Sequence, residues 1–488
     1  MTAIRKAVIV GGGIDAWMAA NALWAAFGST GLAIEVVETP MSVPAGMACA
    51  STPQFRNFLS LAGIAERDLL RAGQASFCLA QRNIGWRGEG RSFARGYGHI
   101  GAPIAGLPFL PFWLKARQHG MDVDLSAFSV GAIAAGNGRA PGAGASLDYG
   151  YQFDLAGAVA LLAAAGRHRG VVAIAANDVT PNHDGTTGRL ASLRLDDGRT
   201  VDGDIFIDAT GGEARLSPAL GSAERLTDDT DRLLLASAPR MQSPHPLVTV
   251  IALPHGWLSV IALRDRTAVC MRFAGALLSD DAAARAATEC VGVPLHPHGI
   301  VPHAKHRRLT PWTGNCVAIG EAACTGSDLD GADLQRLQVS IAHLVSLFPI
   351  DTEMAVEAAI YNERVPLHFD RIEDVMGARR RRNGRTGEPF WDAARAAPIC
   401  DPLAHRLSIF ARRGLAPLYQ DESFGEEDWQ SLLIGMGVMP ESYDPQIDRV
   451  RDDDAIGQMQ SLLGAIRRTV EAMPAHEQAL AAAMAARA

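Results

Sequence analysis

The chain has 488 residues, of which 48% are hydrophobic and 20% charged, so we expect an ordinary globular protein built as one large composite unit or two domains. A formal net charge of −8 provides no basic surface of the kind that nucleic-acid-binding proteins use, and we expect no nucleic-acid partner. The seven cysteines are scattered without paired spacing, which argues against a disulfide framework or a zinc site and favours a reducing compartment.

The beginning of the chain could be mistaken for a signal peptide. Arg5 and Lys6 precede an apolar run, but the glycines at residues 11–13 and Asp15 interrupt it. No apolar run in the sequence is long enough to span a membrane. We therefore expect a cytoplasmic protein without a membrane partner, with a homodimer as one candidate assembly.

The first elements in chain order indicate an α/β fold. Residues 7–10 form a short apolar run that enters a glycine turn, as a buried strand does. Residues 16–27 have apolar helical spacing, and residues 33–37 form a second strand-like run. Strand, glycine turn, helix and strand in this order open a doubly wound, Rossmann-like α/β domain.

Further elements follow the same alternation. Residues 155–167 predict a helix, and residues 171–174 predict the strand after it. Residues 190–195 and 200–207 predict a hairpin whose turn is Asp196-Asp197-Gly198. Residues 204–210 then run as a buried strand into a second glycine turn.

The end of the chain has a helical pattern. Residues 334–347 predict an amphipathic helix, and the pattern is helical from about residue 352 onward. We therefore divide the chain into an α/β module over residues 1–350 and a helical region over residues 351–488. The four arginines at residues 379–382 predict a solvated helix face.

The first glycine turn carries the pattern of a nucleotide-binding site. Gly11 permits the tight turn, Gly13 lets the backbone approach a pyrophosphate, and Ala16 allows close packing of helix on strand. Glu38 ends the second strand, where a carboxylate can accept hydrogen bonds from ribose hydroxyls. The alternative is a purely structural turn, which Asp15 favours slightly, because its carboxylate would repel a diphosphate.

Two later motifs suggest that the nucleotide is FAD. Asp208 and Gly211 belong to a strand that ends in Asp-Ala-Thr-Gly, a pattern that recurs in FAD-binding monooxygenases. Gly320 and Glu321 lie where another strand leads into a helix, and an acid at this place commonly binds the flavin's ribityl or pyrophosphate region. NAD would need only the first motif, so the ordered trio favours FAD.

Motifs along nearly the whole chain resemble those of flavin-dependent tryptophan halogenases, which belong to the FAD-dependent monooxygenase superfamily. Their order and spacing together carry the resemblance, and they lie at residues 11–13, 17–20, 151–154, 204–211, 256–257, 320–323, 347–349, 361–362, 389–391 and 435–437 and at Pro440 and Tyr443.

The resemblance implies a flavin-monooxygenase-like module with an interleaved substrate-side sheet over residues 1–350, followed by the helical region. It also implies reduced FAD (FADH2) supplied by a separate flavin reductase, and a small-molecule substrate. In the family, oxygen and halide then give hypohalous acid. The acid passes through a tunnel to a lysine, which together with a glutamate directs halogenation of an aromatic ring.

The sequence departs from the family at the catalytic residues. Cys78 stands where the family has its lysine, and hypohalous acid would oxidise a thiol. Asp330 falls at the place of the glutamate, but Asp328 and Asp333 add acids beside a site meant for an anion. The alternative for Cys78 is a buried, inert residue.

The substrate side differs as well. His99 is kept, as a catalytic residue or as a structural hydrogen-bonder, but Gly101 replaces the aromatic platform that follows it in the family. Trp257 remains of the wall of two tryptophans between flavin and substrate, and Ser259 takes the place of the second.

Three functions are compatible with these observations. The first is an oxidoreductase that uses reduced FAD and oxygen on an aromatic or other apolar substrate without the lysine-dependent halogenation of tryptophan. The second is a non-catalytic homologue that acts as a binding or scaffold protein. The third is an NAD-dependent dehydrogenase, which would leave the later flavin motifs without a role.

Overall fold

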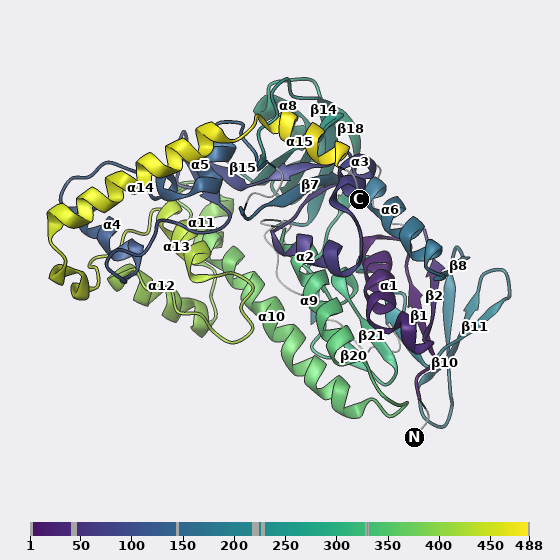
Figure 1. The fold of residues 1–488 in the computed structure, drawn as a ribbon. Helices are drawn as coiled ribbons and strands as arrows, with labels where there is room; N and C mark the ends of the chain where they lie inside the picture. Colours follow the sequence, from purple (N-terminus) through teal and green to yellow (C-terminus); the bar gives the residue numbers. More distant parts are fainter. Residues whose placement is uncertain are drawn as a thin grey trace.

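The computed structural model describes residues 3–40, 46–142, 146–216, 224–225, 230–326, 329 and 331–486, with only the backbone of residues 224–225 described. A six-stranded sheet lies on one side of the molecule, and a group of helices lies on the other side (Figure 1). No helix within the described ranges is both long and apolar enough to cross a membrane.

The six-stranded sheet confirms the predicted α/β opening. It is parallel except for β20 at its edge, and its order is β20 (Trp312–Thr313), β21 (Cys316–Ala318), β12 (Ile205–Asp208), β1 (Lys6–Val10), β2 (Ala33–Glu38) and β8 (Val172–Ala175). Val10 pairs with Asp208, and Asp208 pairs with Ala318. The carboxyl ends of β1, β12 and β21 therefore meet at one edge, which brings the three predicted motifs together.

Helices pack against this sheet at the predicted places. The glycine turn leads into α1 (Ile14–Phe27), which contacts α6 (Leu155–His168) and α9 (Ala332–Ser346). The predicted hairpin also forms, from β10 (Leu190–Leu195) and β11 (Thr200–Asp202). It ends at Asp202, because the residues that follow enter the parallel sheet as β12.

A larger, mostly antiparallel sheet forms the second layer. Its order is β18 (His296–Pro302), β14 (Arg232–Pro239), β17 (Arg266–Phe273), β16 (Gly256–Ala262), β15 (Leu247–Leu253), β5 (Ala80–Ile84) and β6 (Ser92–Gly96). A small sheet of β3 (Ala48–Ala50), β7 (Gly150–Asp154) and β4 (Ser76–Cys78) contacts it through β16 and β15.

The chain after residue 350 is helical, as predicted. Its helices are α10 (Ala355–Arg381), α11 (Pro389–Ala396), α12 (Asp401–Arg413), α13 (Glu426–Gly435), α14 (Asp452–Ala472) and α15 (His476–Ala485). They pack with α4 (Phe109–Gln118) and α5 (Val130–Gly136), while α15 returns to α3 (Glu66–Ala72). The change in secondary structure near residue 350 is therefore not a boundary in packing.

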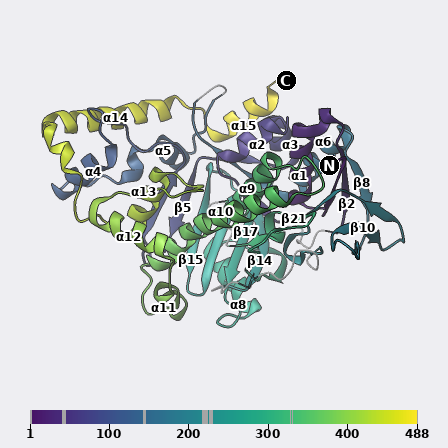
Figure 2. The same cartoon turned by 90° about the horizontal axis from the view of Figure 1, so that it is seen from below.

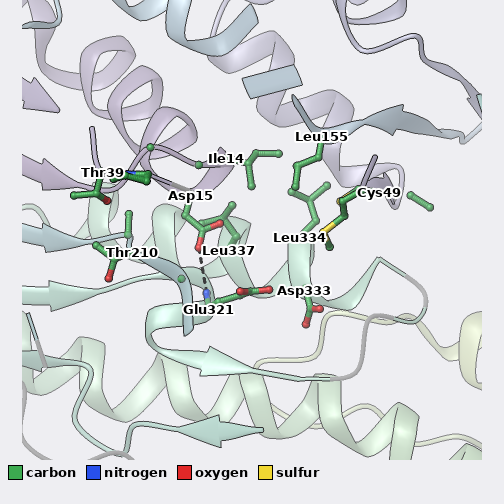
Figure 3. A pocket seen from close by; sticks show the side chains of 17 residues that line it. Ile14, Asp15, Thr39, Cys49, Leu155, Thr210, Glu321, Asp333, Leu334 and Leu337 are labelled. Atoms are coloured by element: carbon green, nitrogen blue, oxygen red, sulfur yellow. Dashed lines mark hydrogen bonds between the residues drawn. The ribbon is translucent and has the colours of Figure 1, made fainter. Parts of the chain in front are cut away.

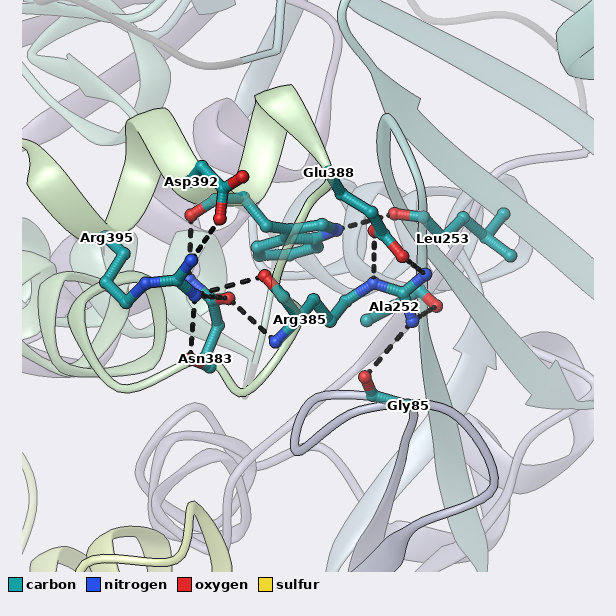
Figure 4. Close-up of polar contacts among 9 residues, drawn as sticks. Gly85, Ala252, Leu253, Asn383, Arg385, Glu388, Asp392 and Arg395 are labelled. Atoms are coloured by element: carbon teal, nitrogen blue, oxygen red, sulfur yellow. Dashed lines mark hydrogen bonds and ion pairs between the residues drawn. The ribbon is translucent and has the colours of Figure 1, made fainter.

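The long helix α10 joins the two sides of the molecule. It contacts β20 and α9 as well as α11 and α12, and it crosses the middle of the molecule in both views (Figures 1 and 2). After α10, Arg385 donates to the carbonyls of Gly85 and Ala252, both at 3.2 Å, and Trp391 donates to Leu253 at 2.8 Å (Figure 4). These bonds fix the helical region to the end of the larger sheet.

The arginine run on α10 is only partly a solvated face. Arg381 is exposed, but Arg379 is completely buried. Its guanidinium donates to Asn83 Oδ1 at 2.7 Å and to Gln81 Oε1 at 2.8 Å on β5. Prediction of a solvated face was therefore wrong for Arg379, because a run of like charges does not reveal amide partners on a distant strand.

Candidate functional site

A cleft opens at the carboxyl edge of the six-stranded sheet (Figure 3). The glycine turn, the end of β2, the loop after β12 and the start of α9 line it, and it holds about 900 Å³ of empty space, counting the part open to solvent. The predicted residues Gly13, Gly211 and Glu321 line this cleft. So do Thr39, Cys49 and Leu155, which the sequence motifs did not predict at the cofactor site.

The glycine turn has the geometry of an anion cradle. A Cβ atom on Gly11, whose φ is +141°, would lie 2.2 Å from the carbonyl oxygen of Ala209, so only glycine lets β1 approach β12 here. Gly13 is the N-cap of α1 and brings no side-chain acceptor. The N–H groups of the first helical turn therefore face the cleft. Ala16 is fully buried behind them.

Three carboxylates from different elements also reach this cleft: Asp15 on α1, Glu321 on η4 (Gly320–Ala322) and Asp333 on α9 (Figure 3). Asp15 Oδ2 accepts a hydrogen bond from the backbone N–H of Glu321 at 3.2 Å. Burial raises the pKa of Asp15 to about 7, and the nearby charge of Asp333 adds to the shift. Gly320 has a φ of +53°, and a Cβ there would collide with the Asp15 carboxylate.

Two carboxylates predicted at the cofactor site, those of Asp208 and Glu38, accept hydrogen bonds from other groups of the protein. Asp208 is fully buried beneath the cleft, and its carboxylate accepts from the Thr210 N–H and hydroxyl and from the Leu216 N–H. It thereby shapes the loop whose Thr210 lines the cleft. Both oxygens of Glu38 accept from Arg167 Nη2 at 2.7 Å, while the next residue, Thr39, lines the cleft.

Asp333 does not present a bare negative charge to the cleft. Its carboxylate lies 2.6 Å from Nη1 of Arg336 and 3.6 Å from Nη2 of Arg272, and both guanidinium groups are almost fully buried. The expected repulsion of an anion therefore does not apply to Asp333, because its counter-charges come from α9 and β17. Asp328 and Asp330, the other acids of this segment, lie outside the described residues.

A second hollow lies between the loop after β6 and the start of α13. It holds about 1280 Å³ of empty space, counting the part open to solvent, and Tyr97 and Phe424 provide its aromatic surface. His99 is 89% exposed there, and its Nδ1 lies 3.1 Å from a carboxylate oxygen of Glu427. Polar groups complete the lining, among them Arg56, Arg95, Asp148 and Asp428.

A narrow space of about 400 Å³ lies between the cleft and this hollow. It shares Ala50 with the cleft and Tyr97 with the hollow. Ser259, at the place of the second wall tryptophan, lines it, whereas Trp257 is buried against Trp86 with ring centroids 6.3 Å apart. The narrow space therefore adjoins the cleft at Ala50 and the hollow at Tyr97.

Cys78 lies beside the narrow space. Its thiol is fully buried and lies 3.9 Å from the Tyr97 hydroxyl and 3.6 Å from the Ala80 carbonyl. Burial raises the pKa of the thiol to about 11, so it is protonated at neutral pH. Cys78 is thus a small buried residue next to Tyr97, which lines the narrow space.

The space next to Gly101 is filled. Gly101 has a φ of +75°, and a Cβ on it would lie 2.1 Å from the ring of Phe109. Phe109 itself packs on Phe128, with ring centroids 4.7 Å apart. The absence of an aromatic side chain at Gly101 therefore does not enlarge the hollow at this point.

Comparison with known proteins identifies this architecture. BrvH, a flavin-dependent halogenase from Brevundimonas sp. BAL3, is 29% identical and superimposes with a TM-score of 0.92 over 98% of this chain and 99% of its own. Xcc4156, a flavin-dependent halogenase from Xanthomonas campestris, is 26% identical with a TM-score of 0.94 over 100% of this chain and 99% of its own. The fold is thus that of the flavin-dependent halogenases, as predicted.

The sequence comparison gives the family. The model of the tryptophan halogenase family matches residues 6–452, and the chain belongs to this family. Tryptophan 7-halogenase RebH from Lentzea aerocolonigenes is 26% identical over 97% of this chain and 98% of its own length.

Proposed function

We propose that this protein binds FAD in the cleft and, with reduced FAD from a separate flavin reductase and oxygen, oxidises an aromatic or other apolar small molecule in the second hollow. The observation that carries the proposal is the succession of three spaces, in which a narrow space adjoins the glycine-lined cleft at Ala50 and the aromatic hollow at Tyr97.

The cleft suits FAD in its main features. The uncapped first turn of α1 offers N–H groups to the diphosphate, and Gly13 lets the backbone come close. Thr210, Gly211 and Glu321 provide polar groups along the same cleft. Reduced FAD, when bound, would supply the two electrons that reduce one atom of O2 to water while the other atom is added to the substrate.

The second hollow suits a substrate with a planar apolar part. Tyr97 and Phe424 offer ring surfaces for stacking. Glu427 holds Nδ1 of the exposed His99, which leaves Nε2 of a neutral imidazole to accept a proton from a hydroxyl or ring N–H of the substrate. We assign His99 this role as a general base. Asp330, at the place of the family's glutamate, stays a candidate catalytic acid.

The lysine-dependent route of the family is not available in this proposal. A protonated thiol at Cys78 carries no positive charge with which to hold an anionic or polarised halogen reagent, and the side chain lines none of the three spaces. Losing a group that positions a reagent costs orders of magnitude in rate.

Calorimetric titration of the apo-protein with FAD tests the cofactor. Saturable binding is expected, and Gly13→Val should abolish it: the backbone φ of −91° accepts valine, but a side chain at the N-cap of α1 would keep the backbone away from the diphosphate. Gly185→Val is the matched control, because a Cβ there meets no atom within 4 Å. Absence of saturable binding in the unaltered protein would contradict the proposal and favour a non-catalytic binding protein.

A further inference from the structure

One acid occupies the part of the cleft that should receive a diphosphate. Asp15 belongs to the first turn of α1, where the N–H groups attract anions. A carboxylate at this position has the same charge as the phosphates. The same cleft thus contains a cradle for an anion and a group that repels it.

The surroundings of Asp15 contain acids rather than bases. Asp333 and Glu321 line the same cleft, and Asp208 lies beneath it. Asp333 is compensated by Arg272 and Arg336. Asp15, in contrast, forms no ion pair with a basic side chain of the described residues, among which the Glu321 N–H donates a hydrogen bond to its carboxylate. Burial, together with the charges of Asp333 and Asp208, raises the pKa of Asp15 to about 7, although the hydrogen bond from the Glu321 N–H acts in the opposite direction.

We propose that Asp15 holds the flavin dinucleotide as a neutral carboxylic acid, so that FAD binding takes up one proton and weakens as the pH rises above neutrality. This inference rests on the proposed binding of FAD in the cleft. A neutral carboxyl group removes the repulsion and leaves an O–H that can donate to a phosphate oxygen.

The direction of the pH dependence follows from linkage. Bound phosphates stabilise the protonated acid further, so the complex keeps its proton to a higher pH than the free protein does. Affinity is then independent of this group below about pH 7, where Asp15 is already protonated. Above that pH the free protein must gain a proton on binding, and the dissociation constant rises by up to tenfold for each pH unit.

Other titrating groups near the cleft do not give the same pattern. Burial lowers the pKa of His306, which lies close to Gly212 at the cleft edge, so this imidazole is already neutral at neutral pH. Burial also raises the pKa of Asp208, but three hydrogen bonds from its own loop occupy this carboxylate and it does not line the cleft.

The test is calorimetry with oxidised FAD between about pH 6 and about pH 8.5, in pairs of buffers with different ionisation enthalpies so that proton uptake is measured directly. The unaltered protein should take up close to one proton per FAD in the upper half of this range. Asp15→Asn should bind FAD without proton uptake, with an affinity that changes little with pH and exceeds that of the unaltered protein by tenfold or more at about pH 8.5. Asp453→Asn, which removes an exposed carboxylate of α14, should keep the pH dependence.

The outcomes separate the two proposals. FAD binding with no proton uptake, or with the same pH dependence in Asp15→Asn, contradicts this inference and leaves the proposed function intact. No FAD binding by either protein at any pH contradicts the proposed function and this inference with it. Circular dichroism of Asp15→Asn checks that the fold is retained, since asparagine Oδ1 can still accept from the Glu321 N–H.

Discussion

At the residue scale, the ring of Phe109 determines that position 101 is a glycine. The ring lies against Gly101, and the backbone of Gly101 has a conformation that residues with a side chain rarely adopt. An aromatic side chain at position 101 would therefore be strained and would collide with Phe109. The platform that the resemblance places here cannot be restored by a single substitution, and the aromatic surface of the hollow comes from Tyr97 and Phe424 instead.

We predict that free tryptophan does not bind saturably to this protein. A stacked phenyl ring contributes about 0.5–1.5 kcal/mol beyond its buried area, and none stands at Gly101 to provide it. The measurement is a calorimetric titration of the FAD-loaded protein with tryptophan, with the tryptophan halogenase RebH as the positive control. A saturable isotherm with this protein would refute the prediction.

Backbone requirements of single residues were predictable, but side-chain partners were not. The glycine turn acts through its own local geometry, so the pattern at Gly11 and Gly13 is sufficient to place it. Glu38 and Asp208 were placed at the cofactor site, yet Arg167 and the Thr210 loop hold their carboxylates. Arg167 is 129 residues away from Glu38 in sequence, and no local pattern reveals such a partner.

At the scale of elements, one buried arginine connects α10 to β5. Arg379 lies over the ring of Trp86, with its guanidinium carbon 5.4 Å from the ring centre, and donates to two buried amide oxygens. Asn83 and Gln81 are almost completely buried, so water cannot replace the guanidinium as their donor.

Replacing Arg379 by methionine should therefore destabilise the protein strongly. Each of the two buried acceptors left without a donor costs about 1–3 kcal/mol, which predicts a loss of about 2–6 kcal/mol in the free energy of unfolding. Urea unfolding measures the loss. Arg467→Met, at an exposed position of α14, is the matched control and should change stability by less than about 0.5 kcal/mol. Equal stability of the two variants would contradict the role of Arg379.

Local elements were predictable where apolar runs and turns are contiguous. The opening strands, α6 and the hairpin correspond to such runs. The seven-stranded sheet was not predicted strand by strand, because it depends on pairs such as β5 with β15, which join residues 80–84 to residues 247–251. Only the resemblance to a known family indicated a second sheet.

At the scale of the whole molecule, a buried histidine attaches helix α15 to the rest of the protein. His476 at the start of α15 is 2% exposed, and its Nδ1 lies 2.8 Å from the carbonyl oxygen of Pro244. A carbonyl only accepts, so Nδ1 carries the hydrogen of the neutral ring. Burial lowers the pKa of His476 from 6.5 to about 4.

Stability should therefore fall on the acid side. The folded protein binds this proton less readily than the unfolded chain, so the contribution of His476 is present above about pH 6.5 and is lost as the pH falls toward 4. At about pH 5 the loss amounts to about 2 kcal/mol. Urea unfolding of the unaltered protein and of His476→Asn across this range isolates it. Parallel stability curves for the two proteins would contradict the prediction.

The central claim is that the protein oxidises its substrate with reduced FAD and oxygen and does not carry out the lysine-dependent halogenation of the family. The most direct test supplies a flavin reductase, NADH, FAD, oxygen, bromide and catalase to the protein with a panel of indoles, phenols and pyrroles, and analyses the products by mass spectrometry. We predict product that has gained one oxygen atom, and no brominated product above a control with free flavin and peroxide. Brominated product well above that control, and persisting with catalase present, would contradict the claim.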